Sequence, residues 1–270
     1  MSTLDPVELA LDWLTRSDIR HANGNTLARG GVSQGYNWKE RRYPFIYSEI
    51  TGYAISTFVN AYRWTNDEIY LAAARQAAGF LLHLQTLAAG DGCPGAIPHG
   101  LTWPDLTPRR QYFSFDVAMC LQGILDLHAL DQAPELARAA QGMSDWLLTH
   151  MQQRNGSFWS MYDGATGSVA DVTADFFSDG GCLHAKHAIG LLKMEQVIGN
   201  GAYAAAARQV CDWVLGLQDA DGAFRATERD RQVISHPHEQ GFVGHHGISA
   251  HSKIKTIPAA ISPMPDQNIA

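Results

Sequence analysis

Hydrophobic and polar positions repeat along this chain with a long period. The segments 70–85 (YLAAARQAAGFLLHLQ) and 203–218 (YAAAARQVCDWVLGLQ) align without a gap, and 145–158 (DWLLTHMQQRNGSF) resembles 212–224 (DWVLGLQDADGAF). A glutamine ends each copy, at positions 85, 152 and 218, so the steps are 67 and 66 residues. A period of this length indicates one helical unit that is used several times.

Each copy predicts a pair of helices. Segments starting at Ser48, Ser114 and Asp179 are apolar almost all round, which is typical of helices enclosed by others. After a short break comes an Ala-rich amphipathic helix that ends at the repeated glutamine, and Pro134 suits the first turn of one of these. Long connections at 86–113 and 153–178 then lead to the next inner helix. Residues 6–15 predict one further outer helix.

The expected fold is all-α, an incomplete α/α toroid of helical hairpins with about seven helices over residues 1–231. The period is too long for tetratricopeptide hairpins, which repeat at about 34 residues. One aromatic residue in each outer helix is expected to pack on the inner ring, at Trp13, Phe80, Trp146 and Trp213. Residues 232–270 lack helical periodicity, and their composition predicts an irregular, disordered tail.

Composition and charge exclude several classes of function. The net charge is −7 and the longest run of Lys and Arg has two residues, so nucleic acid is not an expected partner. No apolar run approaches the ~18 residues of a membrane span, and the first residues are acidic, which predicts a cytoplasmic protein. The four cysteines have no CxxC spacing and predict buried free thiols. No nucleotide-binding or hydrolase-triad motif occurs, so no cofactor is expected.

The long connections all reach the inner helices at their N-termini, so they predict a site on one face of the fold. Glu49 and Asp116 stand at matching places there, one residue apart in register, after Ser48 and Ser114. Two carboxylates around one cavity could act as general acid and base. The alternative for both is structural, because the helix dipole and capping favour acidic residues in a first turn.

Aromatic and basic residues on the same face are candidates for binding a sugar. The connection before the first inner helix has flat rings for sugar faces and two arginines for an acidic substituent, or it is an exposed loop packed on the ring edge. The full set of substrate-binding candidates is Tyr36, Trp38, Arg41, Arg42, Tyr43, Tyr53, Trp103, Trp159, Asp179 and His184. His184 and His187 are one turn apart, but without a third ligand at a diagnostic distance no metal is expected.

The start of the first inner helix, SEITGY at 48–53, together with the outer helix 70–85 and the glutamine turns, resembles six-hairpin α/α toroids of carbohydrate-active enzymes. These include unsaturated glucuronyl hydrolases, sugar epimerases, polysaccharide lyases and VpsJ-type bacterial polysaccharide biosynthesis proteins. The resemblance implies a hydrolase, lyase or epimerase acting on an acidic saccharide in bacterial polysaccharide biosynthesis or modification. A full six-hairpin ring has twelve helices, so about seven predict an open flank and self-association.

Two alternatives stay open. An incomplete ring also suits a catalytically silent helical-repeat binding protein. QDADGAF at 218–224 is similar to the Q-x-x-D-G-x-W repeat of terpenoid cyclases, with Phe224 where that family has Trp. The acidic D-x-D-D and D-D-x-x-D motifs of that family are missing from this chain.

Overall fold

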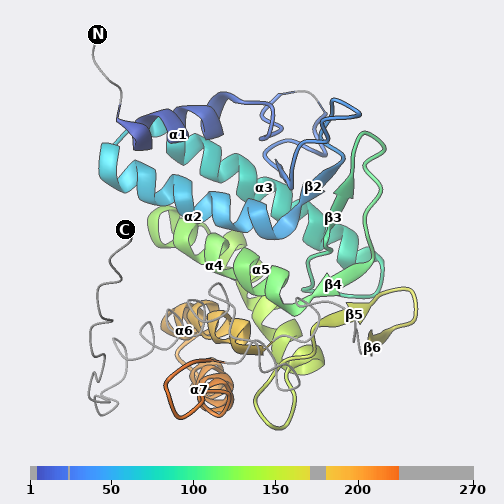
Figure 1. Ribbon diagram of the computed structural model, residues 1–270, viewed down its shortest axis with the longest axis vertical. Helices are drawn as coiled ribbons and strands as arrows, with labels where there is room; N and C mark the ends of the chain where they lie inside the picture. Colours follow the sequence, from blue (N-terminus) through green and yellow to red (C-terminus); the bar gives the residue numbers. More distant parts are fainter. Residues whose placement is uncertain (1–4, 24, 171–180, 225–270) are drawn as a thin grey trace, which may run out of the picture.

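The computed structural model describes residues 5–23, 25–170 and 181–224, and it is built mainly from helices (Figure 1). The described α-helices are α1 (Pro6–Arg16), α2 (Ser48–Thr65), α3 (Glu68–Gly90), α4 (Ser114–Asp131), α5 (Pro134–Trp146), α6 (His187–Ile198) and α7 (Ala202–Leu215). A π-helical turn at Leu147–Met151 extends α5, and a 3-10 helix at Gly181–Lys186 leads into α6.

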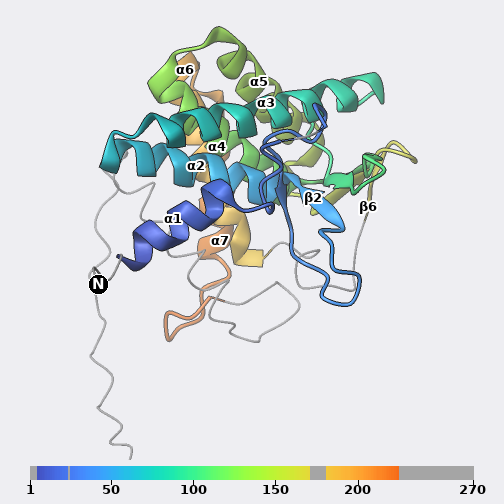
Figure 2. The same cartoon turned by 90° about the horizontal axis from the view of Figure 1, so that it is seen from above.

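The helices form three hairpins, α2–α3, α4–α5 and α6–α7. Helix α2 packs on α3 and α4, while α4 packs on α5 and α6, so α2, α4 and α6 are the inner helices. In the view from above, the outer helices α3 and α5 lie along one side of α2 and α4 (Figure 2). The predicted all-α toroid architecture is confirmed, with α1 as a further outer helix.

The helix boundaries follow from local chemistry. Helices α2 and α4 begin at Ser48 and Ser114, as predicted, and Pro134 occupies the first turn of α5. Both inner helices end in a left-handed residue, Asn66 with φ 56° and Gln132 with φ 53°. The third inner helix was expected from Asp179, which lies outside the described residues, and α6 itself begins only at His187, after the 3-10 helix.

Short strands in the long connections position the inner helices. One antiparallel sheet has the order β1 (Val32–Ser33), β2 (Phe45–Tyr47), β3 (Gly100–Thr102), and a second has β4 (Gln111–Phe113), β5 (Met161–Asp163), β6 (Ser168–Ala170). Strand β2 runs directly into α2, and β4 runs directly into α4. Both sheets therefore lie at the N-terminal ends of the inner helices, on the right of Figure 1, as the long connections predicted.

A glycine turn follows each of the outer helices α1, α3 and α5 and contacts the backbone of the next outer helix. Gly30, Gly95 and Gly156 have φ of 88°, 91° and 93°, a region that side chains disfavour. A Cβ atom on any of them would overlap a backbone carbonyl of the next outer helix. The contacts pair Gly30 with Gln76, Gly95 with Gly142 and Gly156 with Gln209. The repeated glycine is therefore required by both its conformation and a close backbone approach.

The repeated glutamine connects successive outer helices. Nε2 of Gln85 donates to the carbonyl oxygen of Gly95 at 3.1 Å and to that of Ala139, on α5, at 3.0 Å. Nε2 of Gln152 donates to the carbonyl oxygen of Ala206, on α7, at 3.1 Å. The repeated glycine and glutamine thus both contact the backbone of the next outer helix, and we call this contact between neighbouring repeats the joint.

The aromatic anchors of the four outer helices differ in burial. Phe80 and Trp146 are 1% and 2% exposed, as predicted, and Trp213 is partly buried. The prediction is wrong for Trp13, which is 55% exposed. Among the described residues no inner helix precedes α1, and no ring contact involves the Trp13 indole.

All four cysteines are free and buried, as the sequence predicted. Within the described ranges no helix combines the length and the apolar character needed to cross a bilayer. The tail expected at 232–270 lies outside those ranges.

Candidate active site

The N-terminal ends of α2 and α4 bring two carboxyl groups together with a tyrosine and a histidine. The hydroxyl of Tyr47, the last residue of β2, donates to Oδ1 of Asp116 at 3.1 Å. Nδ1 of His99 lies 2.8 Å from Oδ2 of the same carboxyl group, and it donates there when Asp116 is ionised, because a carboxylate can only accept. Asp116 is therefore held by two side chains that come from different connections.

Aromatic rings enclose His99. Its centroid lies 5.1 Å from Phe45, 4.5 Å from Tyr47 and 4.9 Å from Phe113, so rings from β2 and β4 surround it. Its carbonyl oxygen accepts from the backbone N–H of Ser48 at 3.2 Å and from the Ser48 hydroxyl at 3.0 Å. These bonds tie the histidine backbone to the first residue of α2.

Glu49 follows in the first turn of α2 and is partly buried. Burial, and next the negative charge of Asp116, raise its pKa from 4.5 to about 7. Interactions with Tyr47, Lys186 and His99 oppose that rise. At neutral pH the Glu49 carboxyl group is therefore poised between its protonated and its ionised form.

Asp116 is only 3% exposed, and this burial raises its pKa. The hydrogen bonds from His99 and Tyr47 oppose the rise, because they stabilise the carboxylate. Burial and the two neighbouring carboxyl groups also raise the pKa of Tyr47, so its hydroxyl stays protonated and donates.

Lys186 brings a positive charge to the same place from the start of the third inner helix. Its Nζ donates to the hydroxyl of Tyr53, on α2, at 3.0 Å. The ammonium group also lies 4.8 Å from the ring centroid of Tyr53 and 6.0 Å from that of Phe115, on α4. Its charge lowers the pKa of Glu49, so the three inner helices together supply two carboxyl groups and one ammonium group.

The two histidines predicted one turn apart are core residues. His184 is 2% exposed and His187 is fully buried, with its ring stacked on Phe158 at 4.4 Å. Burial lowers the pKa of both, that of His184 to about 3, so both are neutral. The described part of the chain contains no group of three or more His, Cys, Asp or Glu arranged to hold a metal ion. Asp179 falls outside the residues that the structure describes.

Residues 36–43 form a projecting turn, which we call the aromatic arm. Its Tyr36 ring lies 5.2 Å from Trp38 and 5.1 Å from Tyr43, and Trp38 is 83% exposed. Backbone hydrogen bonds between Asn37 and Arg42 close the turn. The Tyr36 ring contacts both of the other rings, and no hydrogen bond or ring contact between described residues joins the arm to Glu49 or Asp116.

The two arginines of the arm differ in their surroundings. Arg42 pairs with Glu40 at 2.6 Å and donates to the carbonyl oxygen of Trp103 at 2.9 Å. Arg41 is exposed and adopts a left-handed backbone, with φ of 52°. Trp103 in turn packs on His21 at 4.6 Å. The guanidinium group of Arg42 is thus occupied within the chain.

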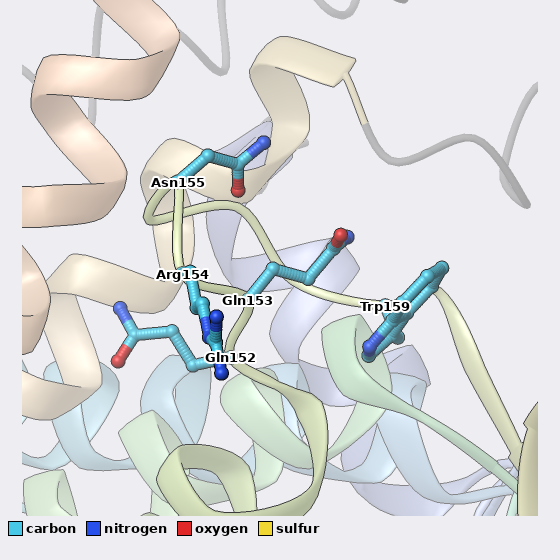
Figure 3. Close-up of a pocket in the computed structure, with 5 residues that line it drawn as sticks. All are labelled: Gln152, Gln153, Arg154, Asn155 and Trp159. Carbon is cyan, nitrogen blue, oxygen red and sulfur yellow. The ribbon is translucent and has the colours of Figure 1, made fainter.

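Trp159 lines an open surface pocket of about 490 Å³, together with the turn at residues 152–155 (Figure 3). The side chain of Gln153 extends toward the Trp159 ring, while Gln152 points to the other side, toward α7. The adjacent Ser160 accepts a backbone hydrogen bond from Ser114 at 3.0 Å, so this segment lies against the start of α4.

Sequence reasoning missed two residues of this cluster, His99 and Lys186, and left Tyr47 out of the candidate site. Tyr47 directly precedes α2, next to the first-turn position of Glu49, so the helix start could have indicated it. Lys186 precedes α6 but lies after the helix start expected at Asp179, so no position in the repeat marked it. No such signal marks His99, because it lies inside a long connection and only the fold brings it to Asp116.

No family model and no curated protein matches this chain at a significant level. Solved structures do resemble it. A GH76 α-mannanase from Bacteroides thetaiotaomicron has a TM-score of 0.69 and 17% identity, over 92% of this chain and 63% of the mannanase. An unsaturated glucuronyl hydrolase from Bacillus sp. GL1 has a TM-score of 0.60 and 15% identity, over 78% of this chain and 57% of its own.

A third similar structure is the cellobiose 2-epimerase from Spirochaeta thermophila, with a TM-score of 0.57 and 15% identity, over 81% and 56% of the two chains. All three are α/α-toroid enzymes that act on carbohydrates. The chain thus spans about 56–63% of the length of these neighbours. At such low identity the comparison establishes the toroid fold, while the reaction of this chain has to be argued from its own residues.

Proposed function

We propose that this chain is a carbohydrate-active enzyme that uses general acid–base catalysis on an acidic saccharide. The observation that carries the proposal is the convergence of Glu49 with the Tyr47–Asp116–His99 network at the starts of the inner helices. A carboxyl group whose pKa is about 7 can both give and take a proton at neutral pH, which is what such catalysis requires.

The two carboxyl groups have different roles in this proposal. The side chain of Asp116 is 4% exposed and that of His99 is 18% exposed, so the histidine is the more accessible of the pair. Asp116 acts as a positioning residue that orients the imidazole, in the way a buried carboxylate orients a catalytic histidine. Glu49 and His99 are then the groups that exchange protons with the saccharide, whereas the sequence alone predicted Glu49 and Asp116.

Lys186 supports an acidic substrate. An ammonium group held over two aromatic rings beside the proton-transfer groups can bind the carboxylate of a uronate and stabilise negative charge that develops next to it. The charge of Lys186 acts on Glu49, whereas Arg41 and Arg42 lie in the aromatic arm, so we assign to Lys186 the role that the sequence gave to the arginine pair. Lys186 also has contacts of its own, and the substrate would add to them.

A placed acid and base can serve several types of reaction on a saccharide. The structural neighbours include a mannanase, a glucuronyl hydrolase and an epimerase, and hydrolysis, elimination and epimerisation all need a placed acid and base. We place the reaction in the cytoplasm and in bacterial polysaccharide biosynthesis or modification, following the resemblance to VpsJ-type proteins. Both assignments are part of the proposal.

A panel of neutral and uronate-containing oligosaccharides tests the proposed function. The purified chain is incubated with each sugar, and three products are measured: new reducing ends for hydrolysis, unsaturated sugars for elimination, and solvent deuterium in recovered sugar for epimerisation. Turnover of uronates that is lost in His99→Gln supports the proposal. Absence of turnover on every sugar, in a folded protein, contradicts it.

A second candidate function is saccharide binding without catalysis, and the aromatic arm favours it. Trp38 is 83% exposed beside Tyr36 and Tyr43, which suits stacking on a sugar ring. Calorimetry with the same panel separates the two functions, because binding without any product identifies the silent binding protein.

A further inference from the structure

The glycine contact of the joint occurs three times in the described chain, twice together with the glutamine contact. Another glycine turn with its glutamine follows α7. The turn at 218–224 has the geometry of the turn at 152–158, since Gln218 pairs with Phe224 as Gln152 pairs with Phe158. Gly222 has a φ of 90°, like the three joint glycines. This turn is therefore built to meet another outer helix.

Among the described residues no helix occupies that position. Within this part of the chain a Cβ on Gly222 would meet only Nε2 of Gln218, at 3.9 Å, whereas on Gly156 it would overlap the backbone of Gln209. The amide of Gln218 donates back to the carbonyl oxygen of Gly222 at 2.9 Å instead of reaching a further helix. Both contacts of the joint, the glycine and the glutamine, are unused by the described chain.

Helix α1 presents the other half of the joint at the opposite end of the fold (Figure 1). The four outer helices can be aligned on their aromatic anchors, Trp13, Phe80, Trp146 and Trp213. In this alignment Leu9 corresponds to the residues that the joint glycines contact, which are Gln76, Gly142 and Gln209. The same alignment pairs Pro6 with Ala139 and Ala206, whose carbonyl oxygens accept from the joint glutamines.

The helix face that contains Pro6, Leu9 and Trp13 is exposed in α1, while the corresponding face of the later outer helices is covered. Ala77, Met143 and Val210 are fully buried, but their counterpart Ala10 is exposed. Leu9 and Trp13 are 51% and 55% exposed, so α1 offers solvent an apolar face that opposes its buried Leu11 and Thr15. An exposed apolar helix face of this kind marks an interaction surface.

We propose that the glycine turn 218–224 of one molecule packs on the Pro6–Trp13 face of α1 in a second copy of this chain. The contact repeats the internal joint, with Gly222 against the backbone at Leu9 and the Gln218 amide donating to the carbonyl oxygen of Pro6. The interface uses two different surfaces, so it is heterologous and generates a closed ring or an open head-to-tail series. It is independent of the reaction at Glu49.

Light scattering and sedimentation of the 270-residue chain over a wide concentration range test the proposal. Wild type is expected to associate with increasing concentration, above the monomer mass of 29.6 kDa. Leu9→Arg blocks the α1 face and is expected to abolish association. Ile69→Arg is the matched control, because Ile69 is an apolar residue on α3 that is 41% exposed and lies outside the joint.

Gly222→Leu blocks the turn, and Gly92→Leu is its control. Gly92 has a φ of 84° and no atom within 4 Å of an added Cβ, so it carries the same backbone strain without a joint. Asp221→Lys, at an exposed position in the same turn, serves if Gly222→Leu does not fold. Both turn variants are expected to be monomeric, and the control is expected to associate like wild type.

Mixing the two kinds of variant gives the decisive result. Leu9→Arg keeps its glycine turn and Gly222→Leu keeps its α1 face, so one productive contact remains between them. Each is a monomer alone, and the mixture forms a 1:1 dimer that grows no further. A monomeric wild type at all concentrations, unchanged association in both variants, or a mixture that stays monomeric would each overturn the proposal.

Discussion

Nδ1 of His99 lies 2.8 Å from Oδ2 of Asp116 and joins the connection after α3 to the first turn of α4. The carboxylate is buried and the ring is enclosed by Phe45, Tyr47 and Phe113. Helix-dipole stabilisation alone needs no such partners, because it acts through the backbone. The buried carboxyl group of Asp116, held by a histidine and a tyrosine, therefore belongs to a polar network with a defined geometry. Because Glu49 is close to this network, the two together can transfer protons.

Glu49→Gln tests the role of the carboxyl group in catalysis. If Glu49 transfers a proton, turnover of a uronate oligosaccharide should fall by about two to four orders of magnitude, the usual contribution of general acid–base catalysis. The melting temperature at neutral pH should not fall, because the amide keeps the shape of the side chain and carries no charge that burial would penalise. Unchanged turnover in this variant would contradict the catalytic role.

The same residue predicts a pH dependence of stability. Folding raises the pKa of Glu49 from 4.5 to about 7, so its contribution to stability is complete below pH 4.5 and is lost as the pH rises through about 7. The loss should be about 2 kcal/mol, allowing for solvent near this partly buried group. Urea unfolding from pH 4 to pH 8 should show a smaller loss of unfolding free energy in Glu49→Gln than in wild type. An equal pH dependence in the two proteins would refute the assignment of this loss to Glu49.

Asp116→Asn and Lys186→Met should shift the pKa of Glu49 in opposite directions. The charge of Asp116 raises that pKa, so its removal should lower it, whereas the charge of Lys186 lowers it, so its removal should raise it. NMR titration of labelled glutamate carboxyl groups measures both shifts. Lys193→Met is the control, because Lys193 pairs with Asp126 and is not among the groups that shift Glu49.

The repeat made most of this fold predictable. Inner-helix starts at Ser48 and Ser114 and the outer helix at Pro134 were predicted to the residue, because apolar periodicity and helix-start chemistry act locally. The third inner helix was expected from Asp179, outside the described residues, and its described part is a 3-10 helix before α6, two helix types that periodicity does not separate. The exposure of Trp13 was missed because it depends on a neighbour that the repeat implies and the described chain lacks.

The candidate site was predictable only in part. Glu49 and Asp116 came from their matching positions in the repeat, and the structure brings them close enough for the charge of Asp116 to raise the pKa of Glu49. His99 was not predictable, because its distance to Asp116 depends on how β3 pairs with β2 and not on sequence spacing. Arg42 was a candidate for an anion, and only the structure reveals its pairing with Glu40.

Gly95→Ala and Gly92→Ala measure what the joint between repeats contributes. Both glycines have positive φ, 91° and 84°, so each alanine should cost about 1 kcal/mol of strain. At Gly95 the new Cβ would also overlap the carbonyl group of Gly142, so this variant should lose at least about 2 kcal/mol more. Urea unfolding measures both, and similar losses would show that the close approach is unimportant.

Trp38→Ala and Trp64→Ala test whether the aromatic arm binds saccharide. Both rings are largely exposed, at 83% and 60%, so neither alanine should change the free energy of unfolding by more than about 0.5 kcal/mol. Trp38 lies in the arm, ahead of the strand that leads into α2, whereas Trp64 lies in the last turn of α2, at the opposite end from Glu49.

Loss of ring stacking in Trp38→Ala should weaken oligosaccharide binding about fivefold to tenfold, which corresponds to about 1 kcal/mol. Calorimetry measures this, and Trp64→Ala should bind like wild type. Equal affinities in all three proteins would remove the arm from the site and leave Lys186 and Tyr53 as the groups to test next.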